Sequence, residues 1–148
     1  MGYSIGEAAK LLNINESTIR YYDKEGLLPF LNRSKSKIRI FNDNDIRYLK
    51  LIECMKKANM SIKDIKTYIE LSLKGDSTIK ERLNLFLKQK ELVNKQIEDL
   101  KETLNVLEYK CWYYETALKD NTLKNIENIK EEDVPLKYKE VRNKLKNI

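Results

Sequence analysis

Residues 15–29 read NESTIRYYDKEGLLP, and this stretch decides the fold of the first half of the chain. Asn15 is a helix-capping residue type, and it predicts a helix from Glu16 to about Lys24. Ile19 and Tyr22 fall on the inward face of that helix. Gly26 suits its end, because glycine tolerates the left-handed conformation that often follows a last turn. The side chains expected to face outward are Glu16, Ser17, Thr18, Arg20 and Tyr21.

A shorter helix is predicted directly before this one. Ser4 to Glu7 has the S-x-x-E form of a capping box, and the apolar residues that follow recur at helical spacing up to Leu12. Two short helices joined by a few residues form a helix-turn-helix, whose second helix can enter the major groove of DNA. Small helical proteins also contain such pairs for packing reasons alone, so the pattern by itself leaves both interpretations open.

The chain then changes from helical to extended patterning. Arg33, Lys35, Lys37 and Arg39 alternate with β-forming residues around a polar turn, which predicts a β-hairpin wing. Wings carry phosphate contacts, for which Arg33 is a candidate. After the wing, Asn42 predicts the start of a third helix and Ser61 that of a fourth, ending near Lys74. Gly75 closes this module.

The charge of the chain is concentrated in the same module. Lys and Arg number 29 against 23 Asp and Glu, a net charge of +6. Residues 1–75 hold 14 of the basic and 9 of the acidic residues, whereas residues 76–148 hold 15 and 14. A positive surface attracts polyanions, and nucleic acid is the commonest such partner. A basic surface that serves only solubility is the alternative.

The composition excludes much enzyme chemistry. With no histidine, the chain has no Ser-His or Cys-His nucleophile pair and no His-ligated metal site. Its two cysteines form neither a disulfide framework nor a metal motif. We therefore expect no catalytic residues, no metal and no cofactor. No apolar run approaches the ~18 residues of a membrane span, so a cytoplasmic protein is expected.

A long helix is predicted after the basic module. A charged fraction of 35% with only 4 Gly and 2 Pro favours a mainly α protein. From Ile79 to Leu118, in alternating steps of four and three residues, eleven of twelve positions are apolar or aromatic, as in a coiled coil. The positions between these ends are Leu83, Phe86, Lys90, Val93, Ile97, Leu100, Leu104, Leu107, Cys111 and Tyr114. The chain has no second long helix to cover this seam, which therefore predicts a homodimer.

Four motifs in the basic module occur in a diagnostic order and spacing: YSIGEAA at 3–9, TIRYYDKEGLLP at 18–29, Arg39, and Asp45-Ile46. With them, residues 2–75 resemble the MerR family of bacterial transcription regulators. The resemblance implies that Ser17, Thr18, Arg20 and Tyr21 contact the operator and that Arg39 contacts phosphate. It also implies that Ser61 and Lys63 lie at a helix N-terminus against the DNA backbone. One departure is that Lys37 and Ile38 stand where the family usually has a wing glycine, so we expect the wing turn to differ in shape from that of the family.

The resemblance also implies an assembly. The expected architecture is a winged helix-turn-helix DNA-binding domain (1–75), a dimerisation helix in an antiparallel coiled coil (76–118) and a short C-terminal segment (119–148). Such a homodimer binds double-stranded, palindromic promoter DNA and distorts it for RNA polymerase at the same promoter. An effector-independent architectural DNA-binding protein is the alternative.

The signal is less well defined by the sequence. The cysteine pairs of metal-sensing relatives are missing, which leaves the thiols. Cys54 matches the cysteine of a MerR subgroup that responds to aldehydes and other thiol-reactive species, although it also suits a small apolar residue at a dimer interface. Cys111 fits the seam as an apolar residue.

Three features of the second half keep alternatives open. Lys90, the polar seam residue, either fixes the register or extends its ammonium group to solvent. The aromatic residues 112–114 either line a small pocket or pack against the DNA-binding head of the partner. Residues after Pro135 recur at helical spacing, which predicts either a docked helix or a frayed tail.

Overall fold

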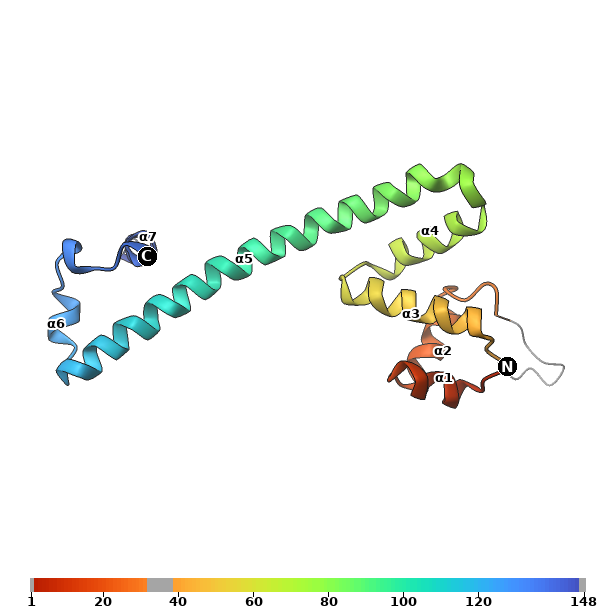
Figure 1. The fold of residues 1–148 in the computed structure, drawn as a ribbon, viewed down its shortest axis with the longest axis horizontal. Coiled ribbons are helices and arrows are strands. Elements are labelled where there is room, and N and C mark those ends of the chain that lie inside the picture. The colour runs from red at the N-terminus through yellow and green to blue at the C-terminus, as the bar shows by residue number, and fades with distance from the viewer. Residues whose placement is uncertain (1, 32–38, 147–148) are drawn as a thin grey trace. The chain divides into compact units, whose positions relative to one another are not determined.

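The structure, a computed structural model, describes residues 2–31 and 39–146. Its helices, labelled in Figure 1, are α1 (Ile5–Leu12), α2 (Glu16–Lys24), α3 (Asp43–Lys57), α4 (Ile62–Leu73), α5 (Ile79–Asp120), α6 (Lys124–Glu127) and α7 (Leu136–Lys146), with short 3-10 helices η1 (Gly75–Thr78) and η2 (Glu131–Asp133). The chain divides into two compact units, Met1–Val93 and Asn94–Ile148, and α5 contributes to both. The three domain limits expected from the sequence remain predictions.

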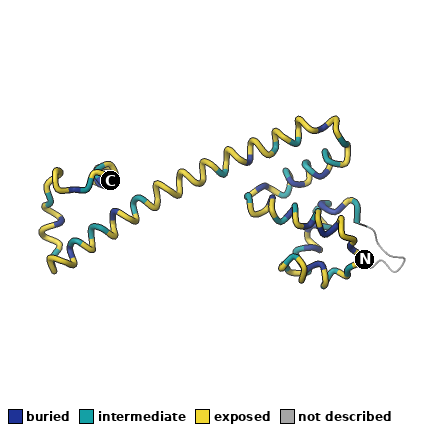
Figure 2. Tube along the Cα trace, in the orientation of Figure 1, coloured by how far each residue is buried: buried dark blue, intermediate teal, exposed yellow. Residues whose placement is uncertain are grey.

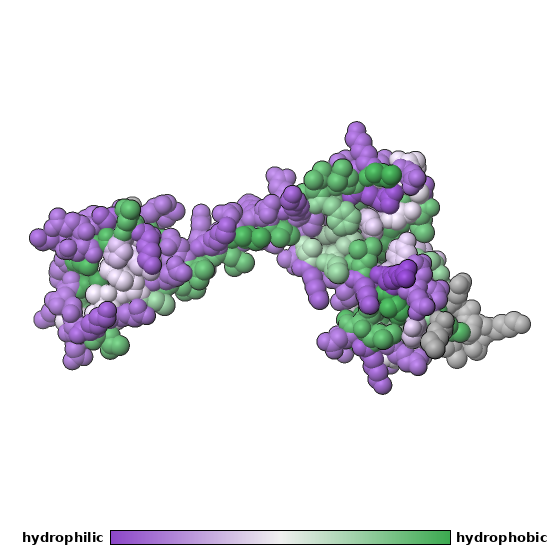
Figure 3. All heavy atoms as spheres, viewed as in Figure 1, coloured by the Kyte–Doolittle hydropathy of each residue, from purple (hydrophilic) through white to green (hydrophobic). Residues whose placement is uncertain are grey.

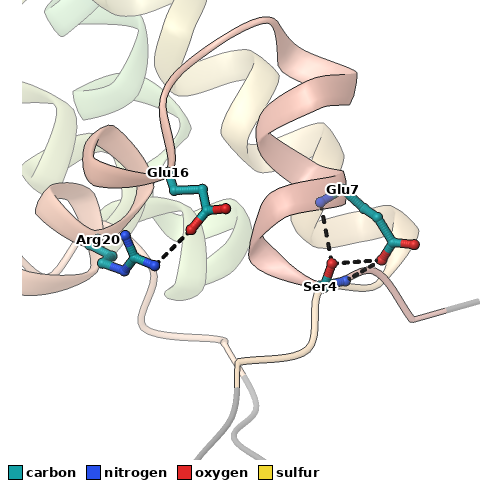
Figure 4. Close-up of polar contacts among 4 residues, drawn as sticks. All are labelled: Ser4, Glu7, Glu16 and Arg20. Atoms are coloured by element: carbon teal, nitrogen blue, oxygen red, sulfur yellow. Dashed lines mark hydrogen bonds and ion pairs between the residues drawn. The ribbon is translucent and has the colours of Figure 1, made fainter.

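Capping side chains start three of the helices where the sequence predicts them. The hydroxyl of Ser4 accepts the backbone N–H of Glu7, and the Glu7 carboxylate accepts the N–H of Ser4 at 2.7 Å (Figure 4). These hydrogen bonds, led by the one from the Ser4 backbone, lower the pKa of Glu7. Asn42 makes the same kind of box at α3, and Ser61 caps α4. Asn15 stands at the predicted position before α2, but its side chain makes no capping bond.

The first unit closes around one hydrophobic core. Its buried residues come from α1 to α4 and from the segments between them, and the buried positions of these helices turn toward one another in Figure 2. The largest fully buried side chains are Phe41, Ile19, Leu27, Leu49, Ile52, Ile65 and Ile69. Phe41 also forms an antiparallel bridge with Tyr3, with backbone hydrogen bonds of 2.7 and 2.9 Å. Most of the predicted wing, including Arg33, lies outside the described residues.

The beginning of α5 belongs to this first unit. Gly75 has φ +78°, which allows the sharp turn after α4, and the buried hydroxyl of Thr78 donates to the carbonyl of Leu71 at 2.6 Å. Further along α5, the Gln89 side chain donates to the carbonyl of Ala58 at 2.6 Å. The end of α3 is thus tied to α5.

The second unit has a small core of its own. The C-terminal segment folds back so that Val134, Tyr138 and Val141 are buried with Tyr109 of α5. Buried Arg142 holds this segment, donating to the Glu131 carboxylate at 2.8 Å and to a backbone carbonyl at 3.0 Å. Of the two alternatives for this segment, the structure has the docked helix.

The aromatic residues of α5 pack within the chain. The rings of Trp112 and Tyr138 lie 5.5 Å apart, and Tyr113 also packs against this core. Of the alternatives for residues 112–114, the chain's own C-terminal segment packs against Trp112 and Tyr113, and Trp112 also lines an open groove between α5 and the start of α7. Tyr114 remains exposed.

The predicted seam of α5 is exposed. Leu100, Leu104 and Leu107 are 67%, 54% and 57% exposed, and Leu83, Phe86, Ile97, Cys111 and Tyr114 are exposed as well. Only Val93 of the predicted contacts is half-buried. Apolar side chains interrupt the polar surface along the middle of α5 in Figure 3.

No helix among the described residues is long and apolar enough to cross a membrane.

A substitution in the core of the first unit tests this packing. Ile19→Ala removes a fully buried side chain from under α2, and we expect it to lower the free energy of unfolding by about 2–5 kcal/mol. Leu11→Ala, at a position that is 56% exposed on α1, is the matched control and should change it by less than about 0.5 kcal/mol. Urea denaturation of both variants measures the difference. Equal effects would show that Ile19 is not a core residue.

Candidate nucleic-acid interface

The exposed face of α2 carries most of the predicted DNA contacts. Ser17, Arg20 and Tyr21 are exposed and Thr18 is half-buried, while Ile19 and Tyr22 point into the core. The buried pair therefore sets the rotation of α2 about its axis. This rotation brings the four predicted contact residues to one helix surface, as a helix that reads base edges requires.

Arg20 is held by an ion pair on the same helix. Its guanidinium group donates to the Glu16 carboxylate at 2.7 Å, and both side chains are about half exposed (Figure 4). Gly6 of α1 makes room for this carboxylate, because a Cβ at Gly6 would come within 3.1 Å of the Glu16 oxygen. The pair preorients Arg20, and an exposed pair of this kind is weak enough for a base edge or phosphate to replace Glu16.

Arg39, the predicted phosphate contact of the wing, is paired with α2. Its Nε donates to the Asp23 carboxylate at 2.7 Å, and a second guanidinium nitrogen lies 2.5 Å from the same oxygen. Both side chains are largely buried. Arg39 therefore ties the C-terminal end of the predicted wing to the end of α2. Asp23 carries no signal in the sequence, because a contact between residues 16 apart leaves no periodic pattern.

A second polar contact joins α2 to α3. The hydroxyl of buried Tyr22 donates to the carboxylate of Glu53 at 2.5 Å. Burial, followed by this hydrogen bond, raises the pKa of Tyr22 far above its ordinary value. The structure assigns Glu53 a positioning role for α2.

The beginning of α4 lies near the end of α2. The Lys66 ammonium group is 3.3 Å from the point where a Cβ of Gly26 would stand, and Gly26 has φ +79°. Ser61 uses its hydroxyl to cap α4, whereas Lys63 is exposed in the first turn. The positive end of the helix and Lys63 both favour a phosphate group at this point.

The candidate sensor lies away from this surface, on α3. Cys54 is exposed in the single chain, and so are Lys56 and Lys57. It directly follows Glu53, whose side chain holds Tyr22. Among the described residues, no group of three or more acidic or cysteine side chains is arranged to hold a metal ion.

Two family models match the chain. "MerR HTH family regulatory protein" matches residues 3–72, and "MerR, DNA binding" matches residues 46–109. Together they cover the helix-turn-helix, the remainder of the first unit and much of α5. The fold and the exposed face of α2 thus agree with a helix-turn-helix regulator.

Individual relatives agree with these models. An uncharacterized HTH-type transcriptional regulator of Haemophilus influenzae is 45% identical over 117 residues, covering 79% of this chain and 87% of the relative. The regulator AdhR of Bacillus subtilis is 33% identical over 88 residues, covering 60% of this chain and 63% of that protein. Among solved structures, HiNmlR, described as a MerR family regulator lacking the sensor domain and bound to promoter DNA, has a TM-score of 0.71 at 44% identity, covering 84% of this chain and 98% of that one.

The chain belongs to the MerR family of helix-turn-helix transcription regulators. The family assignment made from the YSIGEAA and TIRYYDKEGLLP motifs is confirmed. The relatives are regulators rather than enzymes, in agreement with the exclusions drawn from the composition. The residue-by-residue DNA contacts and the sensor assignment remain predictions.

The Tyr22–Glu53 hydrogen bond predicts that two substitutions of Glu53 lower the free energy of unfolding by different amounts. Glu53→Ala leaves the buried Tyr22 hydroxyl without its acceptor, and we expect it to lower the free energy of unfolding at pH 7 by about 1–3 kcal/mol. Glu53→Gln keeps an acceptor oxygen and should cost less. Exposed Glu70→Ala on α4 serves as the control for loss of charge. Urea denaturation measures all three, and equal stability of the two Glu53 variants would contradict the positioning role.

Proposed function

We propose that this protein is a homodimeric transcription regulator that inserts α2 of each copy into the DNA major groove at the two halves of a palindromic promoter element. The observation that carries the proposal is the outward face of α2, with Ser17, Arg20 and Tyr21 held in place by the buried Ile19 and Tyr22. The 44% identical HiNmlR, bound to promoter DNA in its structure, supports promoter DNA as the partner.

Electrostatics support DNA as the partner of the first unit. Residues 1–75 carry 14 basic and 9 acidic residues, and two of the acidic side chains of α2 form ion pairs. Glu16 pairs with Arg20 and Asp23 with Arg39. The carboxylates beside α2 are thereby neutralised, which lowers their repulsion of phosphate.

The assembly is proposed from α5. The exposed apolar seam is too long for a stable single copy in water, and a second identical seam covers it without any further partner. An antiparallel coiled coil of two α5 helices presents two DNA-binding heads related by a twofold axis. Such heads match a palindrome, and the dimer distorts the intervening DNA so that RNA polymerase can use the promoter.

The proposed signal is a thiol-reactive electrophile such as an aldehyde, acting at Cys54. The exposed thiol, with Lys56 and Lys57 close by in sequence, supports this choice. Chemical modification there would act on α3 next to Glu53, which positions the recognition helix through Tyr22.

DNA binding is tested by a footprint on the promoter that lies next to the gene for this protein. The protein should protect two halves of a palindrome, with an affinity that falls steeply with salt. Arg20→Ala removes a guanidinium group from the face of α2 and should cost about 1–3 kcal/mol of binding free energy. Lys95→Ala, at an exposed position of α5, is the control and should leave the affinity unchanged. Binding that ignores DNA sequence would instead support an architectural protein.

The sensor assignment predicts a separation of two activities. Cys54→Ser should abolish the transcriptional response to an added aldehyde and preserve DNA affinity, because the thiol is the reactive group and lies away from α2. Cys111→Ser is the matched control and should keep the response. Reporter-gene assays and a binding titration measure the two activities. A full aldehyde response in Cys54→Ser would exclude this thiol as the sensor.

A further inference from the structure

We propose that two copies of α5 pair in a single antiparallel register, in which Lys90 of each copy forms an ion pair with Glu108 of the other. The inference rests on the proposed homodimer and goes beyond it by naming the residues that fix orientation and register. It assigns roles to a lysine and a glutamate that the DNA-binding face does not use.

Only one apolar face of α5 in the second unit is open to a second copy. The C-terminal segment already covers the face that carries Tyr109 and Trp112, with Tyr138 and Val141 packed against it. The other face holds the seam, whose residues remain exposed along the helix (Figure 2). The chain therefore covers one face of α5 by itself and leaves the seam for a partner of similar shape.

Lys90 is the exception within this seam. It lies between Phe86 and Val93, and its charge would be brought into an apolar contact when two seams meet. Within the described part of the chain, neither Lys90 nor Glu108 forms an ion pair. Burying a charge beside apolar groups is costly unless an opposite charge compensates it, so Lys90 requires an acidic group from the partner.

A parallel pair does not supply that group. In a parallel, in-register coiled coil each seam residue meets its own copy, so Lys90 would face Lys90 and Cys111 would face Cys111. Two ammonium groups would then repel each other inside an apolar seam. Lys90, the polar residue of the seam, thus disfavours the parallel arrangement.

One antiparallel register both covers the whole seam and compensates Lys90. Pairing the first seam position with the last, Ile79 with Leu118, sets Phe86 opposite Cys111 and Lys90 opposite Leu107. Glu108 follows Leu107 on the flank that faces Lys90, within reach of its ammonium group.

Registers shifted by one heptad either bring like charges together at Lys90 or leave seam residues without partners. A shift in one direction places Lys90 opposite Leu100, with Lys101 on the facing flank, and the like charges repel. A shift in the other direction brings Lys90 to Tyr114 and leaves Ile79 and Leu83 without seam partners. The register that pairs Ile79 with Leu118 gives each seam residue a partner and also places an acidic side chain beside Lys90.

The surface around Cys111 is complementary in shape and charge to the residues that this register places against it. An open groove of about 500 Å³ runs between α5 and the start of α7, with Leu107, Cys111 and Trp112 among its apolar lining residues and Glu108, Glu115 and Lys137 as its charged ones. The second copy would bring the Phe86 ring to the apolar part and the Lys90 ammonium group to Glu108. Shape and charge therefore favour a second copy as the occupant.

Cys111 allows the register to be read directly. In the full-length protein with Cys54→Ser, a second cysteine is introduced at Ile79, Phe86 or Val93, three positions one heptad apart. Mild oxidation and non-reducing electrophoresis then detect disulfide-linked dimers. We expect a crosslink for Phe86→Cys, because facing seam residues approach to the Cα separation that a disulfide needs, about 5.5–6 Å. Ile79→Cys and Val93→Cys should remain uncrosslinked, since each would lie about 10 Å along the axis from Cys111.

The parent protein with Cys111 alone is the orientation control. In the proposed register the two Cys111 residues lie roughly 37 Å apart along the axis, so no crosslink is expected. A crosslink through Cys111 alone would show a parallel pair and overturn the inference. A crosslink at Ile79→Cys or Val93→Cys in place of Phe86→Cys would show a shifted register and overturn it too.

Charge reversal provides a second measurement that leaves Phe86 intact. Lys90→Glu and Glu108→Lys should each raise the dimer dissociation constant about tenfold by sedimentation, and the double variant should recover most of the loss. Lys88→Glu and Glu91→Lys, which lie off the seam, are the matched controls. Failure of the double variant to recover would overturn the pairing. A protein that stays monomeric would overturn the homodimer itself, whereas a dimer with altered crosslinks would overturn only the register.

Discussion

The burial of Ile19 and Tyr22 beneath α2 is the constraint on which the candidate DNA interface depends. These two side chains anchor the recognition helix to the core of the first unit and set its rotation. The outward direction of Arg20 and Tyr21 follows from that rotation. A small helical domain can present a rigid reading surface in this way because one amphipathic helix divides its residues between packing and recognition.

Polar contacts add precision that apolar packing alone does not provide. Arg39 pairs with Asp23 at the end of α2, and Tyr22 donates to Glu53 on α3. Apolar contacts are non-directional, whereas hydrogen bonds to largely buried partners specify geometry and are costly to leave unmade. The recognition helix α2 is thereby coupled to the C-terminal end of the predicted wing and to the helix that carries Cys54.

The helix α5 has two apolar faces, one of which is covered and the other exposed in a single chain. The face around Tyr109 is covered by the C-terminal segment, which Arg142 fastens, whereas the seam stays exposed. The segment thus builds a local core without competing for the seam. The groove beside Cys111 also places Glu108 next to the seam. A uniform apolar stripe permits several registers, and a single charged residue such as Lys90 removes that ambiguity.

Local sequence by itself determined the helices α1 to α5, the caps of α1, α3 and α4, and the family. Ser4, Asn42 and Ser61 act within three residues of their own positions, and the inward residues of α2 and the seam of α5 follow from helical periodicity. The tertiary structure alone decided which side chains meet across the fold: Arg39 with Asp23, Tyr22 with Glu53, and Trp112 with the chain's own C-terminal helix. These contacts join residues 16, 31 and 26 positions apart, and no local pattern encodes such a pairing. The physical reason is that capping and periodicity act over a few residues, whereas these partners are chosen by how whole helices pack.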